Sequence, residues 1–336
     1  MVEILITFPL ADELINQLRG ISPQLHIIVS PVKKAESISN EIWGKTDILF
    51  TDNVVPLAEK TQNLKWIQFM SAGLDYWAGS DIFTKPGLLF TSLSGAGTSQ
   101  MAEHVLMMML ALGHRLPAMM TSQRKYEWPR DRIERFQPVE MRDATVGIVG
   151  YGSIGRQVAR LLVPFGMTVL ATKRDAKSPD EHGYSPEGLG DPTGSLVQRL
   201  YPAEALRQML KLSDFIVVCV PLTPKTRGVF SASIFAAIKP GALLIDVSRG
   251  KVIEHGGLIK ALQEGRLAGA ALDVFPEEPL PADSPLWSLP NVIISPHIAD
   301  NSPNFDQRAC ELFSENLHRF LAGIPLYNLY NHELGY

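Results

Sequence analysis

Short apolar runs recur along the chain from about residue 145 onward. They read TVGIV (145–149), MTVLAT (167–172), FIVVCV (215–220), ALLIDV (242–247), GAALDVF (269–275) and NVIIS (291–295). Most are separated by segments with helical periodicity, and runs that are apolar on both faces and joined by helices are typical of parallel strands covered on both sides. The pattern therefore predicts an α/β domain with a doubly wound parallel sheet of six strands.

Helical periodicity is clearest in two segments of this part of the chain. Ile154, Val158, Leu161 and Phe165 recur at spacings of three and four residues, which places them on one face of a helix. A long helix is also predicted over residues 99–123, where AEHVLMMMLALG is apolar enough to be buried. Its methionines are typical of core packing or of a domain junction.

The first hundred residues show a second, smaller alternation of the same kind. Strands are predicted at VEILIT (2–7), LHIIV (25–29), DILFT (47–51), LKWIQF (64–69) and GLLFTSL (87–93). An apolar-periodic helix at 305–323 follows the last strand of the larger unit, and we expect it to return to the first unit and make that unit discontinuous. Residues 178–195 contain three prolines and four glycines, which favours a mobile excursion over a regular element.

Composition narrows the classes of function. The 336 residues are 46% hydrophobic and 20% charged, which is typical of a globular chain with about two domains. The 31 basic and 35 acidic residues give a net charge of −4 without a Lys/Arg block, so we expect no nucleic-acid partner. No run is long enough to span a membrane and no basic segment precedes the first apolar stretch, so we expect a cytoplasmic protein with no membrane partner. Cys219 and Cys310 are too few and too dispersed for a disulfide framework, and no metal site is predicted.

Gly150, Gly152 and Gly155 form a G-x-G-x-x-G pattern between a predicted strand and a predicted helix. In this context the first glycine permits the tight turn, the second lets the backbone approach a pyrophosphate, and the third allows close packing of helix on strand. The N–H groups at the helix start, including those of Ser153 and Ile154, then favour an anion. The sequence therefore predicts a dinucleotide-binding loop.

The end of the second strand indicates which dinucleotide is preferred. An NAD-selective site usually carries an acid there to bind the adenosine ribose, but the chain continues from Thr172 with Lys173 and Arg174. These cations would attract a ribose 2′-phosphate. We therefore predict NADP(H) as the preferred cofactor, with NAD(H) as the alternative and two solvated strand-end charges as the plainer interpretation.

Three ionisable residues follow strand ends of the same predicted sheet, namely Arg249, Glu278 and His297. Ligands of open α/β sheets bind beyond the carboxyl ends of the strands, so these side chains are expected to converge beside the dinucleotide. Reduction of a 2-keto acid by hydride transfer needs a proton donor, a cation for the substrate and a group that keeps the donor charged. Histidine, arginine and a carboxylate fill these roles, because a carboxylate bonded to an imidazole favours its protonated form.

The order and spacing of seven motifs resemble those of the D-isomer-specific 2-hydroxyacid dehydrogenase family, which contains glyoxylate/hydroxypyruvate reductases and D-3-phosphoglycerate dehydrogenase. The motifs span nearly the whole chain and are MSAGLDYW, AEHVLMMMLAL, VGIVGYGSIGRQVA, VPLTPKTRG, IDVSRG, LDVFPEEPLP and NVIISPHIA. The resemblance implies that Arg249 binds substrate, Glu278 pairs with the histidine and His297 is the acid/base. It also implies substrate and cofactor contacts at Ser71, Ala72 and Gly73, at Val220, Pro221, Val247 and Ser248, and at Asp273, whose carboxylate would take the nicotinamide carboxamide.

The same resemblance implies the architecture of the whole enzyme. It predicts a Rossmann cofactor domain at 99–299 and a smaller, discontinuous, flavodoxin-like substrate domain at 1–98 plus 300–336. It also implies a hinged cleft and a homodimer formed through the cofactor domain. The expected activity is NADP(H)-preferring reduction of glyoxylate, hydroxypyruvate or a similar small 2-keto acid.

Some features depart from the family pattern, and some alternatives stay open. Asp246 stands where asparagine is usual, Asp300 stands where glycine is usual, and the excursion after Arg174 is longer than expected. A formate dehydrogenase places glutamine at the position of Glu278, which argues against that activity. A phosphite dehydrogenase and a corepressor-like dinucleotide sensor on the same fold remain as alternatives.

Overall fold

The computed structural model describes residues 1–336, and the chain forms two compact units. Unit 1 comprises Met1–Gly97, Gly183–Pro186 and Ser302–Tyr336, and unit 2 comprises Thr98–His182 and Glu187–Asn301. Each unit is built on one sheet in which all strand pairs are parallel. The prediction of two parallel-sheet α/β domains is therefore confirmed.

The sheet of unit 2 has seven strands in the order β12-β11-β10-β9-β6-β7-β8. They are β6 (Thr145–Val149), β7 (Thr168–Lys173), β8 (Arg199–Pro202), β9 (Phe215–Val218), β10 (Ala242–Asp246), β11 (Leu267–Leu272) and β12 (Val292–Ile294). The six predicted strands are all present, and β8 is an addition. It escaped prediction because it is a four-residue edge strand that ends in proline and buries only Tyr201.

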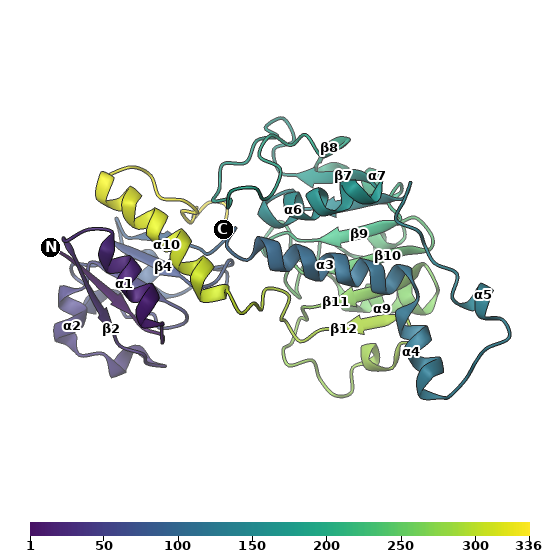
Figure 1. Ribbon diagram of the computed structural model, residues 1–336, viewed down its shortest axis with the longest axis horizontal. Helices are drawn as coiled ribbons and strands as arrows, with labels where there is room; N and C mark the ends of the chain where they lie inside the picture. Colours follow the sequence, from purple (N-terminus) through teal and green to yellow (C-terminus); the bar gives the residue numbers. More distant parts are fainter. The chain divides into compact units, whose positions relative to one another are not determined.

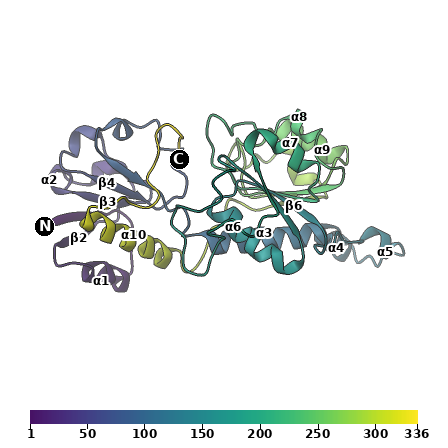
Figure 2. The same ribbon diagram turned by 90° about the horizontal axis from the view of Figure 1, so that it is seen from above.

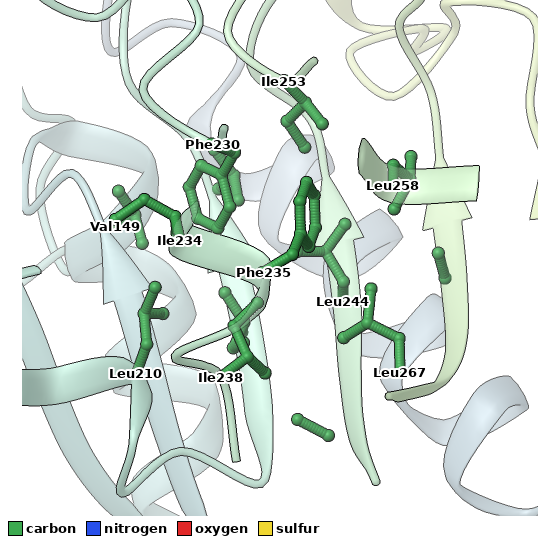
Figure 3. Packing of buried hydrophobic residues seen from close by; sticks show 14 of the residues in the cluster. Val149, Leu210, Phe230, Ile234, Phe235, Ile238, Leu244, Ile253, Leu258 and Leu267 are labelled. Atoms are coloured by element: carbon green, nitrogen blue, oxygen red, sulfur yellow. The ribbon is translucent and has the colours of Figure 1, made fainter. Parts of the chain in front are cut away.

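Helices cover both faces of this sheet (Figures 1 and 2). One face packs against α3 (Thr98–Gly113) and α6 (Ser153–Leu162), and the other against α7 (Leu206–Leu210), α8 (Ala232–Phe235) and α9 (His255–Gln263). Figure 3 shows the core on this second face, where Phe235 lies beside Leu244 of β10, with Phe230 and with Leu258 of α9 in the same cluster. The strands are buried on both faces, as their uninterrupted apolar runs require.

Two helices differ in detail from the prediction. The long helix over 99–123 is broken at Arg115, whose positive φ of 58° ends α3 and starts α4 (Leu116–Arg124). Phe165 lies in a short 3-10 turn and is 41% exposed. The buried face of α6 is formed instead by Gly155, Val158, Ala159 and Leu162 together with two polar residues. The apolar pattern correctly predicted the helix but also included Phe165, which lies beyond its last residue, Leu162.

Unit 1 has a five-stranded sheet in the order β2-β1-β3-β4-β5. Its strands are β1 (Val2–Ile6), β2 (Leu25–Val29), β3 (Ile48–Thr51), β4 (Trp66–Phe69) and β5 (Leu89–Thr91), and its helices are α1 (Asp12–Gly20), α2 (Asn40–Lys45) and α10 (Phe305–Ala322). All five predicted strands are present. The predicted return of the last helix is also observed, because Phe313 of α10 stacks on Phe50 of β3 with ring centroids 4.2 Å apart.

The Pro/Gly-rich stretch 178–195 contains no helix or strand, as predicted. Four of its residues, Gly183–Pro186, are part of unit 1, where the Tyr184 N–H donates to Asn328 Oδ1 at 3.3 Å. Between α4 and β6, residues 125–138 form an arm that extends away from the sheet of unit 2 and carries a short helix, α5 (Arg132–Arg135) (Figure 1). None of the helices combines the length and hydropathy that a bilayer crossing requires.

Candidate active site

His297 and Glu278 form a hydrogen-bonded pair at the carboxyl edge of the sheet of unit 2. His297 Nδ1 lies 2.7 Å from Glu278 Oε2, and the side chains are 44% and 34% exposed. The other carboxylate oxygen, Oε1, accepts the Phe275 N–H at 2.9 Å, so the glutamate is fixed by its own loop. With Nδ1 engaged, Nε2 is the ring nitrogen available to exchange a proton with a ligand.

Asp273 fixes the loop that carries the histidine. Its Oδ1 accepts the Ser295 hydroxyl at 2.7 Å and the Ile298 N–H at 3.0 Å, and its Oδ2 accepts the Ala299 N–H at 3.1 Å. Between these anchors His297 has a φ of 54°, in the left-handed region that few non-glycine residues adopt. Such a conformation persists where the surroundings impose it, and here three hydrogen bonds to one buried carboxylate do so.

Arg249 lies on the segment that follows β10, directly beside the segment that carries Glu278. Its Nη1 donates to the Ser248 carbonyl at 2.8 Å. The neighbouring Gly250 packs so tightly on the next loop that an added Cβ would lie 1.9 Å from the carbonyl carbon of Phe275. Only glycine fits this contact, which keeps the arginine segment against the turn that positions the glutamate.

The glycine loop has the shape that a dinucleotide requires. Gly150 has a φ of 106°, and an added Cβ there would lie 2.8 Å from Val220 Cγ1; at Gly155 it would lie 2.3 Å from the Gly150 carbonyl oxygen. At Gly152, by contrast, an added Cβ would meet no atom within 4 Å. Two glycines are therefore required by the protein's own packing, and the middle one faces open space.

That open space adjoins the start of α6. Gly152 is the N-cap residue and supplies no side chain, so the first N–H groups of the helix, including those of Ser153 and Ile154, stay available to an anion. The loop is held from the neighbouring strand, because Thr172 Oγ1 accepts the Gly150 N–H at 3.3 Å and its carbonyl accepts the Tyr151 N–H at 2.9 Å. These residues fit the pyrophosphate of a dinucleotide.

Lys173 does not point away from the protein as a free strand-end charge. Its Nζ donates to the carbonyls of Ser178 and, at 2.9 Å, Asp180. Burial, followed by the charge of Arg156, lowers the pKa of Lys173. The lysine therefore anchors the excursion, while the neighbouring Arg174 is exposed at the same strand end.

A buried polar cluster that sequence reasoning missed connects the excursion to the glycine loop. Arg156 of α6 is 1% exposed, donates to the carbonyls of Asp191 and Pro179, and places Nε 2.7 Å from Glu181 Oε2 in an ion pair that is not aligned as a hydrogen bond. Its guanidinium lies 4.8 Å from the ring centre of Tyr151. The signal that could have found it is a charged residue directly after Gly155 on the buried side of the helix.

Asp191 completes this cluster. Its Oδ2 accepts the Tyr151 hydroxyl at 2.6 Å and the Leu196 N–H at 3.0 Å, and its Oδ1 accepts the N–H and hydroxyl of Ser195. Burial alone would raise the pKa of Asp191, but these hydrogen bonds outweigh it and hold the pKa below its usual value. Burial, then the bond to Asp191, raises the pKa of Tyr151. The phenol therefore remains a donor.

The remaining predicted cofactor residues fall into two groups. Val220 packs on the glycine loop and Pro221 is exposed after β9. Val247 and Ser248 are buried after β10, and the N–H and hydroxyl of Ser248 donate to Asp246 Oδ1 at 3.0 and 2.5 Å. Burial raises the pKa of Asp246 to about 7.

Ser71, Ala72 and Gly73 lie in unit 1, where they follow the carboxyl end of β4. The Ser71 hydroxyl donates to the Gly73 carbonyl at 3.0 Å, and the Ser71 carbonyl accepts the Leu93 N–H at 2.8 Å. The main-chain N–H groups of the three residues donate to no protein acceptor. A turn with consecutive unsatisfied N–H groups is suited to bind a carboxylate.

Comparison with known proteins identifies the family. Residues 106–299 match the model of the D-isomer specific 2-hydroxyacid dehydrogenase, NAD binding domain. The chain belongs to this family. A glyoxylate reductase from Pyrococcus furiosus is 34% identical over 255 residues, covering 75% of this chain and 71% of the relative. The chain therefore has the fold of this family, with its NAD binding domain over residues 106–299.

Two further matches extend over the whole chain. A D-3-phosphoglycerate dehydrogenase from Methanocaldococcus jannaschii is 30% identical over 98% of this chain, which spans only 60% of the length of that relative. An NADPH-dependent glyoxylate/hydroxypyruvate reductase from Sinorhizobium meliloti, solved in complex with NADP and sulfate, has a TM-score of 0.77 at 27% identity and 100% coverage of both chains. The relatives thus act on more than one 2-hydroxy acid.

Proposed function

We propose that this family member is an NADP(H)-preferring reductase of a small 2-keto acid such as glyoxylate or hydroxypyruvate. The observation that carries the proposal is the 2.7 Å pair of His297 and Glu278 at the same sheet edge as the glycine loop. Unit 2 would hold the dinucleotide, and unit 1 would supply the substrate carboxylate site. The corresponding domains are the proposed 99–299 and 1–98 plus 300–336.

Each polar group has a proposed task. The bound nicotinamide supplies the hydride. His297 holds a proton at Nε2 and delivers it to the oxygen of the keto group, while Glu278 favours the protonated imidazole from the Nδ1 side. Arg249 offsets the negative charge that develops on that oxygen. The free N–H groups of Ser71, Ala72 and Gly73 would hold the substrate carboxylate.

The catalytic pair is tested with His297→Gln and Glu278→Gln. General acid–base catalysis contributes about 10²- to 10⁴-fold in rate, so His297→Gln should lose turnover by that order while the Kd of NADPH stays within a few-fold. Glu278→Gln should lose less, because the imidazole itself remains. Turnover of glyoxylate by His297→Gln within several-fold of the parent would contradict the proposed acid/base role.

The substrate is identified by initial rates over glyoxylate, hydroxypyruvate and 3-phosphohydroxypyruvate, with phosphite and formate in the oxidative direction. The names of the reductases reported above support the first two, the D-3-phosphoglycerate dehydrogenase supports the third, and the glutamate at position 278 argues against formate. We expect the highest kcat/KM for a keto acid whose side chain is small and uncharged. A clear preference for phosphite or for the phosphorylated acid would replace the proposed substrate class.

We also propose a homodimer formed through the arm of unit 2. The arm exposes large apolar side chains, including Tyr126 at 99%, Trp128 at 84% and Ile133 at 76%. A cluster of this kind on a projecting segment is typical of a surface that a second copy covers. Light scattering should give twice the chain mass for the parent and the chain mass for a Trp128→Glu variant.

A further inference from the structure

Asp246 is a buried carboxyl with one oxygen saturated and the other bare. It ends β10, is 1% exposed, and accepts both Ser248 donors on Oδ1. Its Oδ2 is buried without a hydrogen-bond partner. The adjacent Asp273 directly follows β11 and is satisfied by three donors. Of two neighbouring acids, the one with fewer donors keeps its proton more readily.

The titratable groups on the surrounding elements supply no compensating cation. Directly after β9 comes Cys219, whose pKa burial raises to about 12, so the thiol is neutral. From α3 comes His104, whose pKa burial lowers, and its Nε2 lies 3.3 Å from the Ser295 hydroxyl that donates to Asp273. From α9 comes His255, whose pKa burial also lowers. Both imidazoles are therefore neutral at pH 7.

Arg249 is the charged residue next along the chain, and its Nη1 is directed to the Ser248 carbonyl. The acid at position 246 consequently has negative or neutral groups on its two flanking strands. Burial, opposed by the Ser248 hydrogen bonds and reinforced by Asp273, raises the pKa of Asp246 to about 7. A positive charge added near this strand end would therefore favour the ionised form of the Asp246 carboxyl and release its proton at neutral pH.

The sheet order indicates which part of a dinucleotide would lie there. The glycine loop follows β6, with β7 on one side and β9 and then β10 on the other. In a doubly wound sheet the dinucleotide crosses the strand edge at this switch point. Its adenosine half takes the β7 side, so its nicotinamide half takes the side of β9 and β10. The ring is cationic when oxidised and neutral when reduced.

We propose that Asp246 is protonated in the complex with reduced dinucleotide and ionised in the complex with oxidised dinucleotide. The inference rests on the proposed cofactor site. It assigns to this chain a proton that is released when NADP⁺ binds and is retained when NADPH binds. Asn at this position could bind Ser248 in the same way but could not release a proton.

The test is the ratio of the Kd values of NADP⁺ and NADPH between pH 6 and pH 8. The ratio cancels titration of the 2′-phosphate, which both forms carry. For a group with a pKa near 7, the Kd of NADP⁺ should tighten about tenfold relative to that of NADPH over this range. In Asp246→Asn the ratio should stay constant within about twofold. His297→Gln serves as the control background, because it removes the imidazole of the proposed acid/base from the site.

Calorimetry of the parent protein in two buffers of different ionisation enthalpy gives a readout that needs no variant. Close to one proton should be released per NADP⁺ at pH 6, and about none per NADPH. Binding of both dinucleotides with a flat Kd ratio, or an equal slope in Asp246→Asn, would overturn the inference and leave the proposed function intact. Failure of the parent to bind either dinucleotide would overturn both.

Discussion

In unit 2, the loops that follow β7 and β11 are stabilised by opposite chemistry. Beyond β7, two cations hold the excursion by donating to main-chain carbonyls, Lys173 to Ser178 and Asp180, and Arg156 to Pro179 and Asp191. Beyond β11, one anion holds the histidine loop by accepting main-chain N–H groups. Arg156 in the first place and Asp273 in the second are buried, so in both places a buried charge fixes an irregular loop, which a surface salt bridge could not do.

The comparison predicts its largest effect at Arg156. Removing one partner from a buried charged cluster leaves the others unpaired and typically costs about 3–5 kcal/mol. Arg156→Met should lower the unfolding free energy of unit 2 by that order and expose amides of residues 178–195 to hydrogen exchange. Arg160→Met is the matched control on the same helix, because Arg160 is exposed and makes one bond to the Gly190 carbonyl at 3.2 Å. Equal losses in the two variants would contradict the anchoring role.

Asp246 and Asp273 make the comparison sharper, since they are the same residue type on neighbouring strands. A carboxyl with a raised pKa keeps its proton in the folded state while the unfolded chain has lost it. The contribution of Asp246 to the unfolding free energy is therefore fully present below about pH 4, where the carboxyl is protonated in both states. This contribution is lost as the pH rises toward 7. The loss over this whole range should be about 4 kcal/mol, given about 1.4 kcal/mol per pKa unit and a shift from the usual 3.8 to about 7.

Denaturant unfolding of the parent and of Asp246→Asn at pH 5 and pH 8 measures this difference. The variant should lack the part of the pH slope that comes from position 246 and should gain stability relative to the parent at pH 8. A parent and variant with parallel pH profiles would show that Asp246 is ionised in the folded protein at pH 8 without cost.

Strand positions were predictable from the sequence because every central strand is apolar on both faces. The edge strand β8 was not, since burial of Tyr201 alone gives no pattern. The meeting of Glu278 with His297 was predictable, because parallel strands place their carboxyl ends at one edge. The sequence order of motifs also identified the family correctly.

The anchoring of the excursion could not be predicted in the same way. The acceptors of Lys173 and Arg156 are main-chain carbonyls. Every residue has a main-chain carbonyl, so the residue types do not indicate which carbonyls will lie near these cations. The excursion was expected to be mobile, yet Asp191 ties it to Tyr151 across 40 residues. The lack of a hydrogen-bond partner at Asp246 Oδ2 could not be predicted either, because it follows from packing rather than from composition.

Asp273 supports a prediction about activity rather than stability. Asp273→Asn replaces one acceptor oxygen by a donor that opposes the N–H groups of the histidine loop. The kcat should fall by about 10- to 100-fold through misplacement of the imidazole, with the Kd of NADPH nearly unchanged. Because Asp273 and Glu278 would both act through His297, the loss in the double variant with Glu278→Gln should be less than the product of the single losses.

The alternative role of Asp273, binding of the nicotinamide carboxamide, predicts the reverse. The Kd of NADPH would then rise in Asp273→Asn, and the effects of the two substitutions on kcat/KM would multiply. The double-mutant cycle therefore decides between an anchor for the loop and a direct cofactor contact.

The smallest effect is expected at the end of β7, where the structure distinguishes two adjacent cations. Arg174 is the more exposed of the two cations, so attraction of a ribose 2′-phosphate would come mainly from Arg174, while Lys173 donates to the excursion. Arg174→Gln should lower the NADPH/NADH ratio of kcat/KM by about tenfold, which corresponds to about 1.4 kcal/mol. Lys173→Gln should change this ratio less and instead lower the thermal stability, because two carbonyls lose their donor. Better use of NADH than of NADPH by the parent would refute the proposed cofactor preference, and a larger selectivity change in Lys173→Gln would show that the lysine leaves its carbonyl partners when the cofactor binds.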